Sequence, residues 1–475
     1  MTPNPSENSH HAGATQAIRA AGAAPIDLLT APLWKALIFM ALPATIGFVF
    51  NTLYNVVDLI YARSWETSAG SSTQDALGAT FPLFFFQLAF GIGLYQGTTA
   101  LISNAYGRGD LAQARILTIQ ATTYGFLNGL IVAILGLIFL YPILGYAQGL
   151  EGQELDWAAG YMVAVFAGGP LIIANFALYA LLSGAGNNRA FGLSLTIAFF
   201  LNIVFNYIFM HFFGLGIVGL GVATVLIQGP LNFLYVAFEV RLLGALKGAR
   251  LADFIPQLPY MRRVMAQALP ASFSMLMVAA SILITNFFAG FYGGGTLGGL
   301  SAGARIEQVM LLPVIGVGIG SLAIIGQNQG AGQIDRVRAT FWLTTKVVLT
   351  LTVISAALLL IFRIPLSHLV ATPGREADVA AEYLIYSGLG AVFFGLFYIA
   401  TSFKTGVRRP LFSAYVNLFR LIVFPLAFTS LFRLITPEFI AIPWGILTSG
   451  IIVGLASYIW VVRSVRRLRP APAEI

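Results

Sequence analysis

Long apolar segments follow one another along the chain, separated by short polar or basic connections. Each segment is roughly 20 to 28 residues long, enough for an α-helix to cross a bilayer with some tilt. Backbone groups in hydrocarbon need partners within their own segment, and these runs far exceed the roughly 10 residues of a barrel strand. We therefore predict an all-α membrane protein with transmembrane helices only. The twelve predicted spans are 35–62, 76–104, 116–145, 158–182, 188–211, 214–240, 263–291, 297–327, 339–362, 379–404, 410–433 and 439–462.

The same pattern of apolar and polar positions occurs twice. Leu42-Pro43-Ala44 opens one copy, and Leu269-Pro270-Ala271 opens the other. Each copy continues through a Gly-rich segment to a basic turn, at Gly107–Arg115 in the first and Gly330–Arg338 in the second. The glycines at these turns are typical of helix C-caps. Two like halves around a cavity at the membrane midplane are common in secondary transporters, so the repeat predicts transport.

The repeat and the connections predict how the chain is organised. We expect two pseudo-symmetric six-helix lobes around a central cavity, at residues 33–241 and 263–465, joined by a basic cytoplasmic linker at 242–262. Residues 1–32 are rich in small polar residues and have no apolar core of a signal peptide, so we expect a disordered cytoplasmic tail. Residues 466–475 form the predicted C-terminal tail.

Composition agrees with a lipid environment and fixes the orientation. Hydrophobic residues make up 58% of the chain, charged residues 9%, and the mean hydropathy is +0.84, which excludes a soluble protein of this length. Most of the 26 Lys and Arg residues fall on the tails and on alternate connections, which predicts a multi-pass protein with both termini in the cytoplasm. The net charge of +8 is therefore a topology signal, and no nucleic-acid partner is expected. Without cysteine the chain has no disulfide or thiol chemistry.

Only four ionisable side chains lie well inside the predicted spans: Asp58, Arg305, Glu307 and Arg420. Such residues are costly in a bilayer and usually face a cavity or a partner. Arg305 and Glu307 are two positions apart on one helix and so lie on different faces. Arg420, in the eleventh span, is the expected partner of Glu307, and we predict a structural ion pair between them.

Asp58 belongs to a polar stripe on the first span. Asn51, Tyr54, Asn55 and Asp58 recur at helical spacing on an otherwise apolar rod, so the stripe must face water or protein. One interpretation is a carboxylate that binds a proton or a monovalent cation and attracts cationic substrates when empty. The other is a structural hydrogen-bond anchor between helices.

Further polar residues within spans are candidates for the substrate cavity. We predict that Gln87, Asn175 and Tyr179 line it together with Asn51, Tyr54 and Asn55. Aromatic residues, 13% of the chain, offer ring faces suited to planar organic cations. Pro43 removes a backbone donor inside the first helix and permits a kink there, so we predict a hinge, with a static packing kink as the alternative.

Several motifs carry a resemblance to a known family over about residues 33 to 465. They are Leu42-Pro43-Ala44, Tyr54-Asn55-Val56-Val57-Asp58, the helix end at 103–110 and its echo at 326–332, Asn202-Ile203-Val204-Phe205-Asn206, and Gly216 to Thr224. In order and spacing the chain resembles the MATE family, the multidrug and toxic compound extrusion transporters, and more specifically its bacterial DinF-like branch.

The resemblance implies a protein of the bacterial plasma (inner) membrane and export driven by an inward flow of protons or sodium ions. The family's coupling site in the first lobe maps onto Asp58, Asn202, Asn206 and Thr224, with the departure that the family often has Asp where this chain has Asn206. The acids that other branches carry on the seventh and tenth helices are absent here, so coupling is expected to depend on the first lobe.

The sequence supports this grouping independently. Asn202 and Asn206 are four residues apart and share one helix face, and Thr224 follows a Gly-rich stretch that allows close helix approach. One carboxylate with several neutral oxygens suits Na⁺, whereas burial in a low dielectric favours a protonated carboxyl. We expect no cofactor besides the transported H⁺ or Na⁺, with a slight preference for protons.

We therefore predict a cation-coupled antiporter that exports organic cations, drugs and other xenobiotics by alternating access, acting as a monomer. A flippase for a lipid-linked precursor is the alternative, and it would need several cationic residues around its cavity to hold a pyrophosphate. An enzyme is not expected, because the four histidines lie in the N-terminal tail or near predicted helix ends, away from any cluster of acids.

Overall fold

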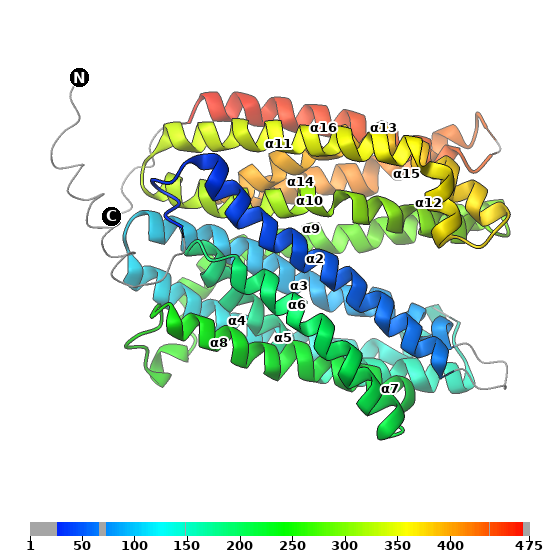
Figure 1. Ribbon diagram of the computed structural model, residues 1–475, viewed down its shortest axis with the longest axis horizontal. Helices are drawn as coiled ribbons and strands as arrows, with labels where there is room; N and C mark the ends of the chain where they lie inside the picture. The colour runs from blue at the N-terminus through cyan, green and yellow to red at the C-terminus, as the bar shows by residue number, and fades with distance from the viewer. Residues whose placement is uncertain (1–25, 66–72, 148, 437, 469–475) are drawn as a thin grey trace. The chain divides into compact units, whose positions relative to one another are not determined.

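The computed structural model describes residues 26–65, 73–147, 149–436 and 438–468. These residues form helices joined by short turns, with no β-strand among them (Figure 1). Within this part of the chain, twelve helical segments are long and apolar enough to cross a membrane. The predicted all-α membrane fold and the number of spans are confirmed.

The described residues pack into two units. Unit 1, chiefly Ile46–Ser272, contains the second part of α2 and the first part of α9. Its helices are α2 (Leu33–Ser64), α3 (Thr73–Gly107), α4 (Leu111–Tyr141), η1 (Pro142–Ala147), α5 (Gly152–Gly184), α6 (Arg189–Asn206), η2 (Tyr207–Phe212), α7 (Gly216–Leu226), η3 (Ile227–Leu231), α8 (Asn232–Leu242), η4 (Leu251–Phe254) and α9 (Leu258–Ala289).

Unit 2 comprises Leu28–Thr45 and the described residues from Phe273 onward. After the second part of α9 it contains η5 (Gly290–Tyr292), α10 (Thr296–Gly330), α11 (Ile334–Ile361), α12 (Arg363–Val370), α13 (Arg375–Gly406), α14 (Pro410–Leu418), η6 (Phe419–Val423), α15 (Phe424–Phe432) and α16 (Ala441–Arg466). The segments η1, η2, η3 and η6 are π-helical, and η4 and η5 are 3₁₀ turns.

Two long helices change units shortly after an internal proline. The boundary in α2 follows Pro43 by two residues, at Thr45–Ile46, and that in α9 follows Pro270 by two, at Ser272–Phe273. Both helices continue through their prolines without a break. The predicted lobes at 33–241 and 263–465 stay a prediction. By packing, the first turns of α2 belong to unit 2 with the second half of the sequence, and the first turns of α9 belong to unit 1 with the first half.

The residues before α2 are held in unit 2. Leu28 is 1% exposed, and its carbonyl accepts hydrogen bonds from Asn328 Nδ2 and Arg336 Nη2, both at 3.1 Å. Arg336 Nη2 also donates to the carbonyl of Ala31 at 2.9 Å. Residues 1–25 of the predicted disordered tail lie outside the described part of the chain. Its end is ordered instead, because Leu28 and Leu29 are buried and the Leu28 carbonyl is hydrogen-bonded.

The connection before α9 is held in unit 1 by side chains of α4, among them Gln120, Thr123 and Arg115. Gln120 Nε2 donates to the carbonyls of Asp253 and Ile255 at 2.7 and 2.9 Å, and Gln120 Oε1 accepts from the backbone N–H of Gln257 at 2.8 Å. The predicted linker at 242–262 is therefore fixed to α4, and helix α9 begins within it at Leu258.

The two repeated basic turns have the same geometry. Helices α3 and α10 end at Gly107 and Gly330, as the predicted C-caps require, and the chain then turns through left-handed glycines, Gly109 at φ 75° and Gly332 at φ 72°. A side chain is strained at such φ values, which explains a glycine at the same place in both halves.

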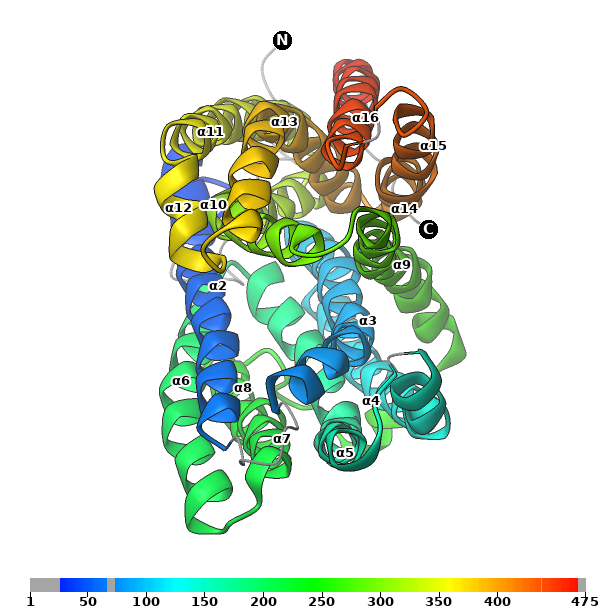
Figure 2. The same ribbon diagram turned by 90° about the vertical axis from the view of Figure 1, so that its right-hand side faces the viewer.

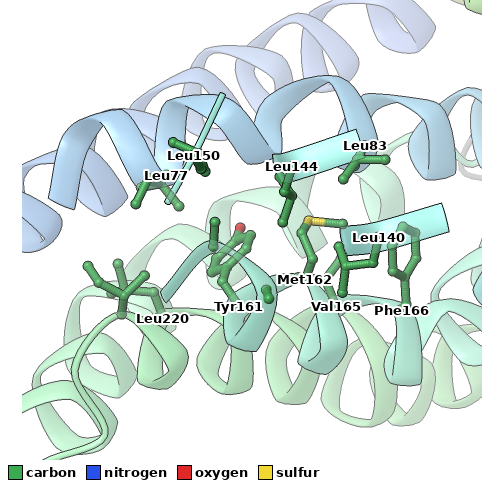
Figure 3. Packing of buried hydrophobic residues seen from close by; sticks show 14 of the residues in the cluster. Leu77, Leu83, Leu140, Leu144, Leu150, Tyr161, Met162, Val165, Phe166 and Leu220 are labelled. Atoms are coloured by element: carbon green, nitrogen blue, oxygen red, sulfur yellow. The ribbon is translucent and has the colours of Figure 1, made fainter. Parts of the chain in front are cut away.

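Helix α5 is the centre of unit 1, where it packs against α3, α4 and α7 (Figure 2). Its buried side chains meet leucines of α4 and η1 in one apolar cluster (Figure 3). Phe166 is fully buried and lies against Gly136 of α4. Any residue larger than glycine at position 136 would clash with its ring. In unit 2, α13 has the corresponding place and packs against α10, α11 and α16.

Three features of the fold were not predicted. Most helices extend past the predicted spans, because helical hydrogen bonds continue into polar residues beyond the apolar run; α10, for example, ends at Gly330. The short helix α12 (Arg363–Val370) lies between two spans. The π-helical segments η3 and η6 interrupt the sixth and eleventh spans, η2 ends the fifth, and hydropathy does not distinguish them from α-helix.

Close approach of α4 and α5 yields a testable prediction. A Cβ added at Gly129 would lie 2.6 Å from Pro170 Cα and 2.8 Å from Gly169 O, and neither backbone atom can rotate away. We expect Gly129→Ala to lower the free energy of unfolding by about 1 to 3 kcal/mol, measured as a lower Tm of the purified protein. Gly450→Ala is the control, because nothing lies within 4 Å of its added Cβ. Equal Tm values for the two variants would contradict this account of the α4–α5 contact.

Candidate functional site

Asp58 lies buried in unit 1, on the face of α2 that meets α6. Its side chain is 6% exposed, and its Oδ1 accepts hydrogen bonds from Asn202 Nδ2 at 2.9 Å and Asn206 Nδ2 at 2.8 Å. Both asparagines are fully buried. Their spacing of four residues aims both amides at one oxygen, as the helical periodicity predicts.

Two further contacts bring α2 close to α6. A Cβ added at Gly47 would lie 2.9 Å from Gly192 Cα, so the two helices approach almost to backbone contact there. About four turns farther along α2, the Tyr61 hydroxyl donates to the carbonyl of Ile203 at 2.9 Å. Small residues at one end and a hydroxyl at the other therefore position Asp58 between the two asparagines.

Thr224 lies next to this group but does not bond to Asp58. Its Oγ1 accepts a hydrogen bond from the Tyr54 hydroxyl at 3.0 Å, one turn before Asp58 on α2. Tyr54 is 3% exposed and Thr224 1%. The four predicted coupling residues thus lie in one buried region, in two parts: Asp58 with Asn202 and Asn206, and Thr224 with Tyr54.

Tyr161 of α5 also belongs to this region, although the sequence pattern did not indicate it. Its hydroxyl lies beside Thr224 and in the electrostatic field of Asp58. The close packing of α5 on α7 brings it there, because a Cβ added at Gly221 would lie 2.8 Å from the Tyr161 carbonyl and 3.2 Å from Ala164 Cβ. The sequence does have small residues on both of these spans, and small residues favour close contact between helices. They do not indicate which polar side chain lies at the contact.

Several acceptors of the site have no partner. The Oδ1 atoms of Asn202 and Asn206 are buried without a hydrogen bond, and no described side chain donates to Asp58 Oδ2. Two N–H donors stabilise the carboxylate as an anion, while Oδ2 stays free to take a proton. With both amides rotated, the carboxylate, the two amide oxygens and the Thr224 hydroxyl would make an all-oxygen donor set of the type that hard cations prefer.

The backbone around the site is irregular at two points. Helix α6 ends at Asn206 and continues as the π-helical segment η2, and α7 gives way to the π-helical segment η3 just after Thr224. A Cβ added at Gly219 would lie 2.7 Å from Phe209 C, so η2 and α7 touch through backbone atoms. π-helical turns are frequent at functional sites, because they shift the register of the side chains on either side.

The polar stripe on α2 divides between two environments. Tyr54 and Asp58 face the interior of unit 1, whereas Asn55 is exposed and its Nδ2 donates to the carbonyl of Asn51 at 2.8 Å. Asn51 is partly exposed. The stripe therefore presents its carboxylate to protein and its asparagines toward the helix surface.

The other predicted cavity residues are buried and link helices. Gln87 Nε2 donates to the carbonyl of Val165 at 3.4 Å, and Asn175 Nδ2 donates to the carbonyls of Gln228 at 2.8 Å and Gly229 at 3.1 Å. The Tyr179 hydroxyl donates to Ser194 Oγ at 2.6 Å and also bonds Asn232. The Asn175 carbonyl partners belong to η3, so its amide satisfies acceptors of the π-helical segment. A role in binding substrate stays a prediction for all three.

The predicted structural ion pair between Glu307 and Arg420 is not formed, and this prediction is corrected. No salt bridge joins these two side chains in the described structure. Glu307 Oε2 instead accepts a hydrogen bond from the Tyr383 hydroxyl at 2.5 Å, and the Arg420 guanidinium lies over the ring of Phe397, 4.5 Å from its centroid. The direct partner of Glu307 is therefore a phenol and that of Arg420 is an aromatic ring, whereas the sequence predicted that the two opposite charges would pair with each other.

Comparison with known proteins identifies the family. The MatE family model matches residues 43–208 and 270–431, one match in each half of the chain. The chain belongs to the MATE family. Members of this family are multidrug efflux transporters, and the chain is accordingly a multi-pass membrane protein with a transporter fold. Both matches begin at a proline where the repeat was recognised, Pro43 and Pro270.

Similar sequences are distant but long. The chain is 24% identical to the "FAD transporter" of Shewanella oneidensis over 85% of this chain and 89% of that protein. It is also 24% identical to the "Probable multidrug resistance protein YoeA" of Bacillus subtilis over 66% of this chain and 68% of that one. The names of these two relatives indicate different transported molecules.

Solved structures show the same fold. A crystal structure of MATE in complex with MaL6 superposes with a TM-score of 0.84 at 22% identity, covering 93% of this chain and 98% of that one. An outward-facing conformation of a multidrug resistance MATE family transporter gives 0.81 at 21% identity, with 93% and 97% covered. A transporter of the MOP superfamily from Pyrococcus furiosus, titled as having a binding pocket of reverse polarity, gives 0.83 at 22% identity, with 92% and 97% covered.

The two amide donors on Asp58 yield a prediction on stability. Asn206→Leu removes one hydrogen bond from the carboxylate, which costs about 1.5 to 3 kcal/mol when the partner is charged and less when it is neutral. We expect the loss of Tm to be larger at alkaline pH, where Asp58 is ionised, than at acidic pH, where it is protonated. The Tm of purified protein across a pH series measures this.

The control is the same substitution in an Asp58→Asn background. Because that background has no ionisable group at the site, the loss of Tm caused by Asn206→Leu should not depend on pH. If both backgrounds show the same pH dependence, the hydrogen bond to Asp58 is not its source.

Proposed function

We propose that this MATE transporter exports small organic molecules in exchange for an inward-moving cation, with Asp58 as the group that binds the cation. The supporting observation is a carboxylate buried within a membrane span, held by two amides through one oxygen and free at the other. A buried ionisable group in a span is expensive, and its usual justification is ion or proton transfer.

A proton fits the described geometry better than a sodium ion. Both asparagines turn their N–H groups toward Asp58, and these positive dipoles oppose a metal ion at Oδ1. Na⁺ binding requires the two amides to rotate so that their unpartnered Oδ1 atoms face the carboxylate. Protonation of Oδ2 requires no such rearrangement. We therefore favour H⁺ as the coupling ion, with Na⁺ at Asp58, Asn202, Asn206 and Thr224 as the alternative.

Protonation changes the contact between α2 and α6. The ionised carboxylate holds Asn202 and Asn206 through charge-assisted hydrogen bonds, which are about twice as strong as bonds to a neutral acceptor. A proton on Asp58 weakens both bonds at once and so lowers the free energy needed to move α2 relative to α6. Pro43 leaves α2 without one backbone hydrogen bond, at a point where bending is least costly. Coupling then arises because cation occupancy favours one of two shapes of α2.

The cargo class rests on two lines of support. The multidrug relatives and the single negative charge of Asp58 favour organic cations and drugs as cargo, exported from a bacterial cytoplasm by a monomer with both termini inside. A second candidate is an anionic aromatic cargo, which the "FAD transporter" relative suggests and a cationic group in unit 2 supports. The flippase alternative predicts movement of a fluorescent lipid-linked precursor in the same vesicles.

Transport in proteoliposomes tests the coupling site. Vesicles that contain the parent protein should move ethidium against its gradient when a proton gradient is imposed, and Asp58→Asn should reduce this to the level of protein-free vesicles. An amide cannot change charge with proton binding, so the gradient has nothing to act on. Separate proton and sodium gradients identify the coupling ion.

Asp335→Asn is the matched control for this experiment. Its carboxylate is 95% exposed on α11, so the substitution removes the same charge at a place without a proposed role. Proton-driven transport should be retained. If Asp58→Asn transports as well as Asp335→Asn, Asp58 is not the coupling group.

Pro43 tests the hinge. Pro43→Ala restores a backbone donor in α2, so we expect the helix to resist bending and proton-driven transport to fall, with the Tm unchanged or higher. Pro270→Ala, at the equivalent place in α9, is the comparison and should affect transport less. If the Pro43→Ala variant transports as fast as the parent protein, the proline is a static packing kink and not a hinge.

A further inference from the structure

Arg420 is a cation near the middle of the span Pro410–Phe432, in unit 2. It belongs to the π-helical segment η6, and its own carbonyl accepts a hydrogen bond from Ser449 Oγ at 2.8 Å. An arginine at this depth is costly in a bilayer and marks a functional site more often than a structural one. The irregular backbone around it points the same way.

The guanidinium has aromatic neighbours in place of an acid. Its Cζ lies 4.5 Å from the ring centroid of Phe397 and 5.1 Å from that of Phe394, both on α13. Phe394 stacks in turn on Tyr398 at 5.7 Å with an interplanar angle of 15°. Cation–π contact holds the planar group in place but leaves its N–H donors unused.

At least one of these donors lacks a partner. Arg420 Nε is buried without a hydrogen bond, while the residue as a whole is partly exposed. Arginine is always charged and offers five donors in a planar fork that matches a carboxylate or a phosphate. An orphaned donor on a guanidinium that aromatic rings hold in place is therefore available to an anionic partner.

The nearest candidate acid is occupied by a phenol. Glu307 and Arg420 interact electrostatically but form no salt bridge, and Glu307 Oε2 is bonded to the Tyr383 hydroxyl at 2.5 Å. Tyr383 is 8% exposed, so its hydroxyl has few other acceptors. By holding Glu307, this hydroxyl keeps the guanidinium free for an external anion.

We propose that Arg420 binds the carboxylate or phosphate of an aromatic substrate, whose ring packs on Phe394, the partly exposed phenylalanine beside the guanidinium. The proposal deepens the proposed function by naming a class of cargo, and it rests on that function for the step of transport. Binding itself requires no ion gradient. A fork of charge-assisted hydrogen bonds supplies the affinity, and the ring faces select planar molecules.

Two flavins that differ by one phosphate test this directly. FMN and riboflavin share the same ring, and quenching of their fluorescence by the purified full-length protein gives a Kd for each. We expect FMN to bind about tenfold or more tightly than riboflavin, the ratio that one charge-assisted hydrogen bond provides. Arg420→Gln should abolish the difference by weakening FMN alone, and Arg420→Lys should retain part of it.

Tyr383 and Glu307 distinguish a binding role from a structural one. Tyr383→Phe frees Glu307 to compete for Arg420, so FMN should bind several-fold more weakly while riboflavin is unaffected. Glu307→Gln removes the competitor, so the double variant Tyr383→Phe/Glu307→Gln should recover the affinity of the parent for FMN. A merely structural arginine would not give this recovery, and the test remains available if Arg420→Gln does not fold.

The proposal is overturned if FMN and riboflavin bind the parent equally, or if Arg420→Gln leaves their ratio unchanged. If inorganic phosphate displaces FMN with a Kd equal to that of FMN itself, the flavin ring contributes nothing to binding, which contradicts the proposed aromatic contact. Proton-driven transport by the Asp58→Asn variant is measured separately, and a failure there leaves the equilibrium ratio of FMN to riboflavin unaffected. The two proposals therefore fail independently.

Discussion

The constraint that governs this protein is the lack of water to satisfy backbone groups in the membrane. Every described span is helical for that reason, and a departure from α-helix must find its own partners. The π-helical segments η3 and η6 do so: Asn175 donates to two carbonyls of η3, and Ser449 to one of η6. These irregular places lie beside Thr224 and around Arg420. The candidate chemistry therefore lies where the regular helix is interrupted.

Small residues are the second requirement, because they allow polar side chains on different helices to meet. Gly47 brings α2 against α6 near one end of their contact, and Asp58 meets its two asparagines farther along. Gly221 performs the same task between α5 and α7, beside the Thr224 hydroxyl. In a lipid environment close packing replaces the hydrophobic effect as the force between helices, so each polar contact depends on glycines some distance away.

The two halves repeat one architecture but differ in chemistry. Both have a left-handed glycine after the second helix of the repeat, at Gly109 and Gly332, and both have a proline early in the first. Unit 1 contains a buried carboxylate held by amides, and unit 2 contains a guanidinium held by aromatic rings. The repeat therefore supplies the scaffold, and divergence within it places the two proposed sites, one for a small cation in unit 1 and one for a larger anion in unit 2.

The sequence alone determined the class of fold, the number of spans, the internal repeat and the grouping of Asp58 with Asn202 and Asn206. Hydropathy period and helical spacing are local properties, and they survive in a single chain without knowledge of its contacts. Tertiary structure decided the rest: that Tyr383, not Arg420, is the partner of Glu307, that Thr224 bonds Tyr54 instead of Asp58, and that the residues before α2 are packed. Those outcomes depend on which helix faces meet in space, and opposite charge in a sequence does not fix the distance between two side chains.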